Sequence, residues 1–145
     1  MREILFRGKN PVSSEWAYGS LILEKNAFDE RLILAIISDA DENETLVNPE
    51  TVGQYTGLKD LHGTRIFEGD VVTHKNYAFD VYYNTEYAGF YPFYDADSGA
   101  GYGVEAKNCE IIGNVFDNSL EELQNGNQRI SKRQWKIGTG EKNDK

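Results

Sequence analysis

The sequence predicts a mainly β protein, with a small N-terminal β lobe, an SH3-like β-barrel, a short C-terminal helix and a polar tail. Glycine, proline, asparagine and aspartate interrupt the chain at short intervals, which is typical of turns between strands. The apolar segments between these turns are short and rich in β-branched and aromatic residues. We therefore expect the lobe over about residues 1–50, the barrel over about 51–117, the helix over 118–124 and the tail over 125–145.

The N-terminal lobe is predicted to hold three strands. Ile4–Phe6 is an apolar segment that precedes a turn signal. Trp16–Leu23 places apolar residues at an imperfect period of two, which indicates a half-buried strand. Leu32–Ile37 is a fully apolar run, and we expect residues 31–37 to pair with the strand before them as a hairpin.

This apolar run also fits a helix. Asn26 could cap a helix over residues 27–38, with Asp29 and Glu30 near its positive end. The strand is favoured because the run is short, rich in isoleucine and bounded by polar clusters. The acidic segment Asp39–Glu44 is expected to form a surface loop.

The stretch Val47–Thr73 carries the densest turn chemistry in the chain. Asp60 is expected to accept hydrogen bonds from the backbone that follows it, and Gly63 is expected to adopt a positive φ. The pair Gly69-Asp70 lets the chain bend sharply before a run of β-branched residues. This stretch therefore predicts a strand, a turn, a short strand, a corner and a further strand.

Several blocks of sequence form a longer pattern around this stretch. The central blocks are NPETVGQYTGLKD at residues 48–60, then Gly63, then IFEGDVV at residues 66–72. With these blocks the chain resembles the YopX-type family of phage and prophage proteins over about residues 1–123. Three further segments fit the same resemblance: Arg2–Arg7, Glu15–Gly19 and Glu110–Asn118.

The resemblance implies a phage or prophage origin, a bacterial cytoplasmic setting and no assigned enzymatic role. It supplies no catalytic residue and no cofactor. On this basis residues 1–124 are expected to form one YopX-like domain, and the tail after Gln124 lies outside the resemblance.

Two strands and a short helix are predicted in the second half of the chain. Tyr77–Tyr83 alternates most regularly, and Asn84–Gly89 should form a turn after it. Cys109–Phe116 is the second strand, with a bulge at Gly113. Polar residues are expected to cap a helix over residues 120–123. The alternating strand should place four side chains on one face: Tyr77, Phe79, Val81 and Tyr83.

The formal net charge of −9 is unevenly distributed. Residues 125–145 hold six basic and two acidic side chains, a balance of +4, which leaves −13 in residues 1–124. Because an acidic body repels phosphate backbones, direct nucleic-acid binding is not expected. The basic tail is expected to dock on its own chain or on a neighbour, and the second case would give a homo-oligomer through residues 125–145.

The sequence gives no sign of membrane insertion or secretion. No apolar run approaches the roughly 20 residues that span a bilayer, and the chain does not begin with a secretory signal. A cytoplasmic location is therefore expected. The one cysteine, Cys109, excludes an intrachain disulfide and is expected to be a small buried residue.

No catalytic, cofactor or metal site is predicted. His62, His74 and Cys109 lack the close spacing of a zinc site. The segment from Asp95 fails the calcium-loop pattern at the positions that require Asp or Asn, Gly and Glu. Asp70 is expected to bond to backbone N–H groups at the corner instead of taking part in acid–base chemistry.

An aromatic segment is the candidate binding surface. No Lys or Arg stands between Lys75 and Lys107, whereas base-stacking surfaces normally include basic side chains. A peptide or protein face therefore fits better than nucleic acid, and core packing is the alternative for most of these rings. Pro92 indicates an edge strand or a bulge. The candidate residues are Tyr82, Tyr87, Phe90, Tyr91, Phe93 and Tyr94.

Together these features predict a phage or prophage accessory protein that acts as a non-catalytic protein-binding module. One alternative is an acidic mimic of nucleic acid that occupies a host DNA-binding protein or nuclease. A less favoured alternative is a metal-dependent hydrolase that uses Asp70, or Asp95 and Asp97.

Overall fold

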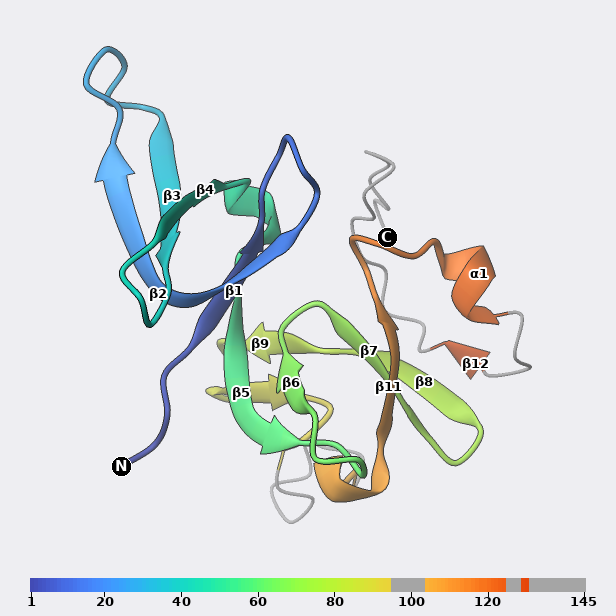
Figure 1. Cartoon of the computed structure of the whole chain (residues 1–145). Coiled ribbons are helices and arrows are strands. Elements are labelled where there is room, and N and C mark those ends of the chain that lie inside the picture. The colour runs from blue at the N-terminus through green and yellow to red at the C-terminus, as the bar shows by residue number, and fades with distance from the viewer. Residues whose placement is uncertain (95–103, 125–128, 131–145) are drawn as a thin grey trace. The chain divides into compact units, whose positions relative to one another are not determined.

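The computed structural model describes residues 1–94, 104–124 and 129–130 (Figure 1). These residues form mostly antiparallel sheets with one short α-helix, so the predicted mainly β class is confirmed. The chain divides into two compact units, unit 1 over Met1–Gly57 and unit 2 over Leu58–Lys145. Each unit is described by itself below.

Unit 1 is built on consecutive antiparallel strands. Within unit 1 the strands lie in the order β4-β3-β2-β1-β5. The elements of unit 1 are β1 (Phe6–Lys9), β2 (Trp16–Lys25), β3 (Ile33–Ser38), β4 (Glu44–Val47), a 3₁₀ turn η1 (Pro49–Thr51) and β5 (Gly53–Lys59), whose last two residues belong to unit 2.

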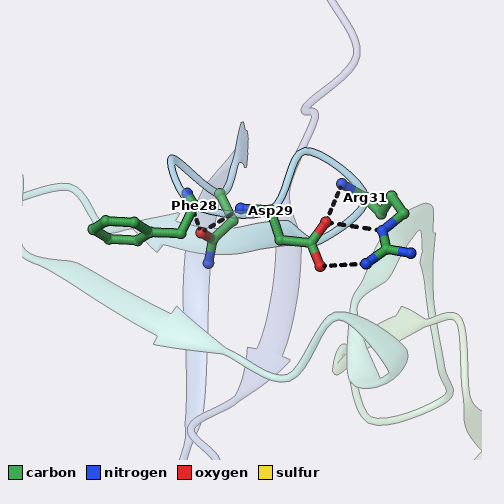
Figure 2. A network of polar contacts seen from close by, with 4 residues as sticks. Phe28, Asp29 and Arg31 are labelled. Atoms are coloured by element: carbon green, nitrogen blue, oxygen red, sulfur yellow. Dashed lines mark hydrogen bonds and ion pairs between the residues drawn. The ribbon is translucent and has the colours of Figure 1, made fainter.

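The strand favoured over residues 31–37 is confirmed as β3, which spans Ile33–Ser38, and the helical alternative is wrong. β3 pairs with β2 from Ser20 opposite Ser38 to Lys25 opposite Ile33. Asn26 caps a turn instead of a helix, because its Oδ1 accepts the backbone N–H groups of Phe28 at 2.8 Å and Asp29 at 3.2 Å. The carboxylate of Asp29 in turn accepts hydrogen bonds from the backbone and guanidinium N–H groups of Arg31 (Figure 2).

The first strand begins later than predicted, at Phe6 instead of Ile4. Phe6 pairs with Gly19 of β2 on one side and with Gln54 of β5 on the other, so it lies inside the sheet. Ile4 precedes the paired residues and is exposed. The backbone pairing on both sides, which the local sequence does not reveal, fixes where this strand starts.

The core of unit 1 lies on one face of this sheet. Ala35, Ile37 and Val47 are buried there. A close approach at Gly8 helps to form this core, since a Cβ there would lie 2.6 Å from Cγ2 of Val47. The half-buried residues packed against it are Phe6, Ala17, Leu21 and Val52.

The acidic segment after β3 is a loop, as predicted. The Oδ1 atom of Asp39 accepts the backbone N–H groups of Asp41 and Asn43, both at 2.9 Å. This turn leads directly into β4, which the sequence analysis missed. η1 was missed as well, although Asn48 caps it by accepting the N–H of Glu50 at 3.0 Å.

Unit 2 contains a four-stranded and a two-stranded sheet. Their strand orders are β11-β7-β8-β12 and β10-β9, and β12 runs parallel to β8. Among the described residues these sheets are separate, and the SH3-like barrel stays a prediction. The elements are β6 (Arg65–Phe67), β7 (Asp70–His74), β8 (Tyr77–Asp80), β9 (Tyr82–Asn84), β10 (Gly89–Tyr91), η3 (Ala106–Asn108), β11 (Glu110–Asn114), α1 (Leu120–Gln124) and β12 (Arg129–Ile130).

Buried carboxylates hold the two predicted turns of unit 2. Asp60 accepts the backbone N–H groups of His62 and Thr64, both at 2.9 Å. Asp70 accepts the N–H of Phe67 at 2.8 Å across the corner, where Gly69 has a φ of 91°. Both aspartates are buried, and their predicted roles as turn residues are confirmed.

The predicted single strand Tyr77–Tyr83 is interrupted. Val81 leaves the ladder and bonds to the corner, where its N–H donates to the carbonyl of Asp70 at 2.8 Å. The alternation of faces holds in β8, but each face carries buried residues, Phe79 on one and Ala78 and Asp80 on the other, whereas Tyr77 at the start is exposed. Phe79 belongs to the larger hydrophobic cluster of unit 2, and Ala78 belongs to a second cluster on the opposite face.

The last elements agree with the predictions. β11 pairs with β7 through a bulge between Ile111 and Gly113. A Cβ at Gly113 would lie 2.4 Å from Oδ1 of Asn118, so a larger residue at this bulge would require the Asn118 side chain to move. The Oγ atom of Ser119 accepts the N–H of Glu122 at 3.1 Å and caps α1.

Candidate binding surfaces

The titratable groups of the described residues do not converge on a metal site. Within the described ranges, no group of three or more His, Cys, Asp and Glu side chains could hold a metal ion. His62 pairs with Glu110 at 3.1 Å in an exposed position. Cys109 is fully buried, as predicted, and burial raises the pKa of its thiol to about 11.

The carboxylates considered for acid–base chemistry have structural positions or lie outside the described residues. Asp70 is 3% exposed and bonded to the corner backbone. Asp95 and Asp97 fall in the part of the chain that the structure does not describe. No helix among the described residues is long and apolar enough to cross a bilayer.

The six candidate aromatic residues lie on or next to the β9–β10 hairpin, but their exposure differs. Tyr91 is 7% exposed and belongs to the larger hydrophobic cluster of unit 2. Tyr82, directly opposite on β9, stacks on it with ring centroids 4.8 Å apart. Phe79 meets the same ring edge-on at 6.0 Å. These three rings therefore build the core beneath the hairpin.

The other four candidates lie nearer the surface. Phe90, Phe93 and Tyr94 are half-buried and pack against the same cluster. Burial raises the pKa of the Tyr94 phenol to about 12. Tyr87 is 51% exposed, and its ring lies 5.4 Å from that of Tyr94. Within the candidate set, Tyr87 therefore offers the most surface to a partner.

A further tyrosine, missed as a site residue, completes this surface. Tyr83 is 44% exposed and meets Phe90, its direct neighbour across the hairpin, edge-on at 5.2 Å. Tyr83 directly follows Tyr82, so the period-two pattern places it on the other face of the strand. This pattern is the signal that could have identified Tyr83 from the sequence. The rings form two pairs on or next to the same hairpin, Tyr83 with Phe90 and Tyr87 with Tyr94, and we call these four residues the tyrosine surface.

The turn between β9 and β10 positions Tyr87. Oδ1 of Asn84 accepts the backbone N–H groups of Glu86 at 2.9 Å and Tyr87 at 3.2 Å. Ala88 then takes a φ of 51° before the chain re-enters β10. This local geometry confirms the predicted turn and leaves the Tyr87 side chain outside the core.

Unit 1 contains a shallow hollow of about 340 Å³ at the end of its sheet. The guanidinium of Arg7 lies over the Trp16 ring, 4.4 Å from its centroid. Hydrogen bonds from the backbone of Asn43 lower the pKa of Asp39. The hollow therefore combines aromatic side chains with one carboxylate, but Asp39 and Asn43 bond to each other and hold the turn between β3 and β4. Its lining residues are Trp16, Ala17, Tyr18, Ile37, Asp39, Asn43 and Thr45.

The fold and these surfaces define a two-unit, mainly β protein whose candidate site is formed by aromatic side chains. Among the described residues, no cluster of titratable groups suggests a catalytic site. The family model described as YopX protein matches residues 5–121, and the chain belongs to this family. This confirms the resemblance drawn from the blocks at residues 48–60 and 66–72. No curated protein matches the chain.

Proposed function

We propose that this member of the YopX family is a non-catalytic module that binds a protein partner through its tyrosine surface. The observation that carries the proposal is the pair of half-exposed tyrosines, Tyr83 and Tyr87, each backed by a half-buried ring. The phage or prophage origin and the bacterial cytoplasmic setting implied by the resemblance belong to the same proposal.

The physical support is the chemistry of the tyrosine side chain. Tyrosine offers a large contact area with few rotatable bonds and a hydroxyl that tolerates water, so it is enriched at protein interfaces. The edge-on contact of Tyr83 with Phe90 restricts its ring before binding, which lowers the entropy lost on association. No basic residue stands between Lys75 and Lys107, which disfavours nucleic acid as the ligand.

The test is affinity capture from host lysate with matched variants. The wild type and Tyr77→Ala should recover the same specific protein, and a Tyr83→Ala, Tyr87→Ala variant should lose it. Tyr77 is the control because it is 48% exposed but lies on β8, outside the hairpin. Equal recovery by all three proteins, or recovery of nothing, would contradict the proposal.

A further inference from the structure

The β2–β3 hairpin of unit 1 has an open edge. β1 pairs with β2 only at residues 16–19, and β4 pairs with β3 only at residues 35–38. Among the described strands, none pairs with the outer edge of residues 20–25 (Figure 1). These residues lack proline, glycine and a bulge, so about 20 Å of backbone can accept another strand.

An apolar row crosses the sheet toward this edge. Ile22 is directly opposite Ile36, and Ile36 is directly opposite Leu46, so the three share the face that does not carry the core of unit 1. Leu46 is 50% exposed, and the two isoleucines are half-buried. We call these three residues the Ile22 row.

The opposite face of the hairpin also exposes apolar groups. Leu23 is 62% exposed and Ile33 is 44% exposed. A two-stranded ribbon is marginally stable in water, and one that carries apolar residues on both faces gains stability when another segment covers it. Exposed apolar patches of a few hundred Å² commonly mark interaction sites.

The charges beside the row define the partner. Glu24 follows Ile22 on the same face, and Glu44 precedes Leu46 on that face. The adjoining loop adds Asp39, whose pKa is held low by backbone hydrogen bonds from Asn43. On the edge itself Lys25 follows Glu24, but it lies on the opposite face, and no Lys or Arg stands between Arg31 and Lys59. The open edge therefore favours a cationic partner, and two copies of a chain with net charge −9 would repel each other.

We propose that the edge of β2 binds an extended segment of a partner protein that carries a Lys or Arg two positions from an apolar residue. Main-chain hydrogen bonds add this segment as a further strand. Its apolar side chain extends the Ile22 row, and its basic side chain pairs with Glu24, two residues away on the same face. This surface lies on unit 1 and does not depend on the tyrosine surface.

The probe is the peptide Thr-Lys-Val-Ile-Val-Thr, titrated into the full-length protein and followed by amide chemical shifts. In an antiparallel register its Ile lies beside Ile22 and its Lys beside Glu24. We expect shifts at residues 20–25 and at Ile36, and we expect weaker binding when the peptide Lys is replaced by Glu. Absence of shifts at the β2 edge, even at millimolar peptide, would overturn the proposal.

Charge reversal supplies the sharper test. Glu24→Lys should bind the Glu-containing peptide more tightly than the Lys-containing one, whereas Glu15→Lys, an exposed control, should keep the wild-type preference. An unchanged preference in Glu24→Lys would overturn the proposal. Two other results would also overturn it. Concentration-dependent dimerisation through β2 would show that a second copy occupies the edge. Changed chemical shifts at residues 20–25 after removal of residues 131–145 would show that the tail occupies it.

Discussion

Asp60 and Ile111, which are 51 positions apart in the chain, are joined by a hydrogen bond of 3.3 Å from the backbone N–H of Ile111 to Oδ2 of Asp60. The other carboxylate oxygen holds the turn before β6. One buried side chain thus connects this turn to β11.

Asp60→Ala should lower the free energy of unfolding by about 1–3 kcal/mol, because three backbone N–H groups lose their acceptor. Urea denaturation measures the change. Asp41→Ala, at an exposed loop position, is the control and should stay within about 0.5 kcal/mol of wild type. An Asp60 variant as stable as that control would show that the carboxylate is dispensable.

The same carboxylate should contribute to acid sensitivity. Burial raises the pKa of Asp60, but the backbone hydrogen bonds from Thr64, Ile111 and His62 outweigh it, so the pKa lies below its ordinary value of 3.8. A lowered folded-state pKa gives stability that is present above pH 3.8 and is lost as pH falls through the folded-state value. Asp60→Asn should therefore show a smaller loss of stability across this acidic range, followed by urea denaturation at each pH. A loss equal to that of wild type would contradict the assignment.

Gly63 should be required for its backbone conformation alone. Its φ is 80°, and a Cβ there would meet nothing within 4 Å. Gly63→Val should cost about 1–2 kcal/mol of unfolding free energy, and Gly63→Asn should cost less because asparagine tolerates this region. Chemical denaturation of both variants separates the two effects. Equal losses would point to a cause other than φ.

Gly8 and Val47 should show energetic coupling. Gly8→Ala places a Cβ 2.6 Å from Cγ2 of Val47, and such overpacking typically costs about 1–3 kcal/mol. Val47→Ala removes the two methyl groups, including the nearest atom, although the Val47 Cβ at 2.9 Å remains. The double variant should therefore be more stable than the sum of the two single losses predicts. A double-mutant cycle of unfolding free energies measures this coupling, and strict additivity would contradict the close approach.

Cys109 should resist thiol reagents in the folded protein. Its side chain is fully buried, and burial raises the thiol pKa to about 11. Since the thiolate is the reactive form, iodoacetamide labelling at pH 8 should be slow and should accelerate on addition of denaturant. Fast labelling under native conditions would indicate that the sheet opens around this residue.

If the proposed non-catalytic function is right, divalent cations are not expected to stabilise the protein. We expect the melting temperature to change by no more than about 1 °C with Mg²⁺, Mn²⁺ or Ca²⁺, whereas an ion at 100 times its Kd would add about 2.7 kcal/mol. Differential scanning fluorimetry is sufficient for this measurement. A large shift with one ion, abolished by Asp95→Asn, would instead support the metal-dependent hydrolase.

Local chemistry explains which parts of the fold the sequence could predict. The turns at Asp60, Gly69 and Gly113 follow from side-chain hydrogen bonding and backbone freedom, which act within a few residues. β4 and the later start of β1 were missed because cross-strand pairing defines them. The strand break at Val81 has the same origin, since its bonds go to a corner about ten residues earlier.

The candidate site could be predicted only in part for a similar reason. Composition pointed to the aromatic segment, but the sequence does not separate Tyr91 in the core from Tyr87 at the surface. That division depends on which face of β9–β10 packs against the cluster beneath it. Alternation along the strand places Tyr82 and Tyr83 on opposite faces, so this part of the division could have been predicted. The position of Tyr87 depends instead on the turn that Asn84 holds.

The most direct test of the proposed function is photo-crosslinking in host cells, with benzoylphenylalanine in place of Tyr87, of Tyr83 and, as a control, of Tyr77. We predict one discrete protein adduct at the two hairpin positions and none at Tyr77. The absence of an adduct at both hairpin positions, or the same adduct at all three, would contradict binding through the tyrosine surface.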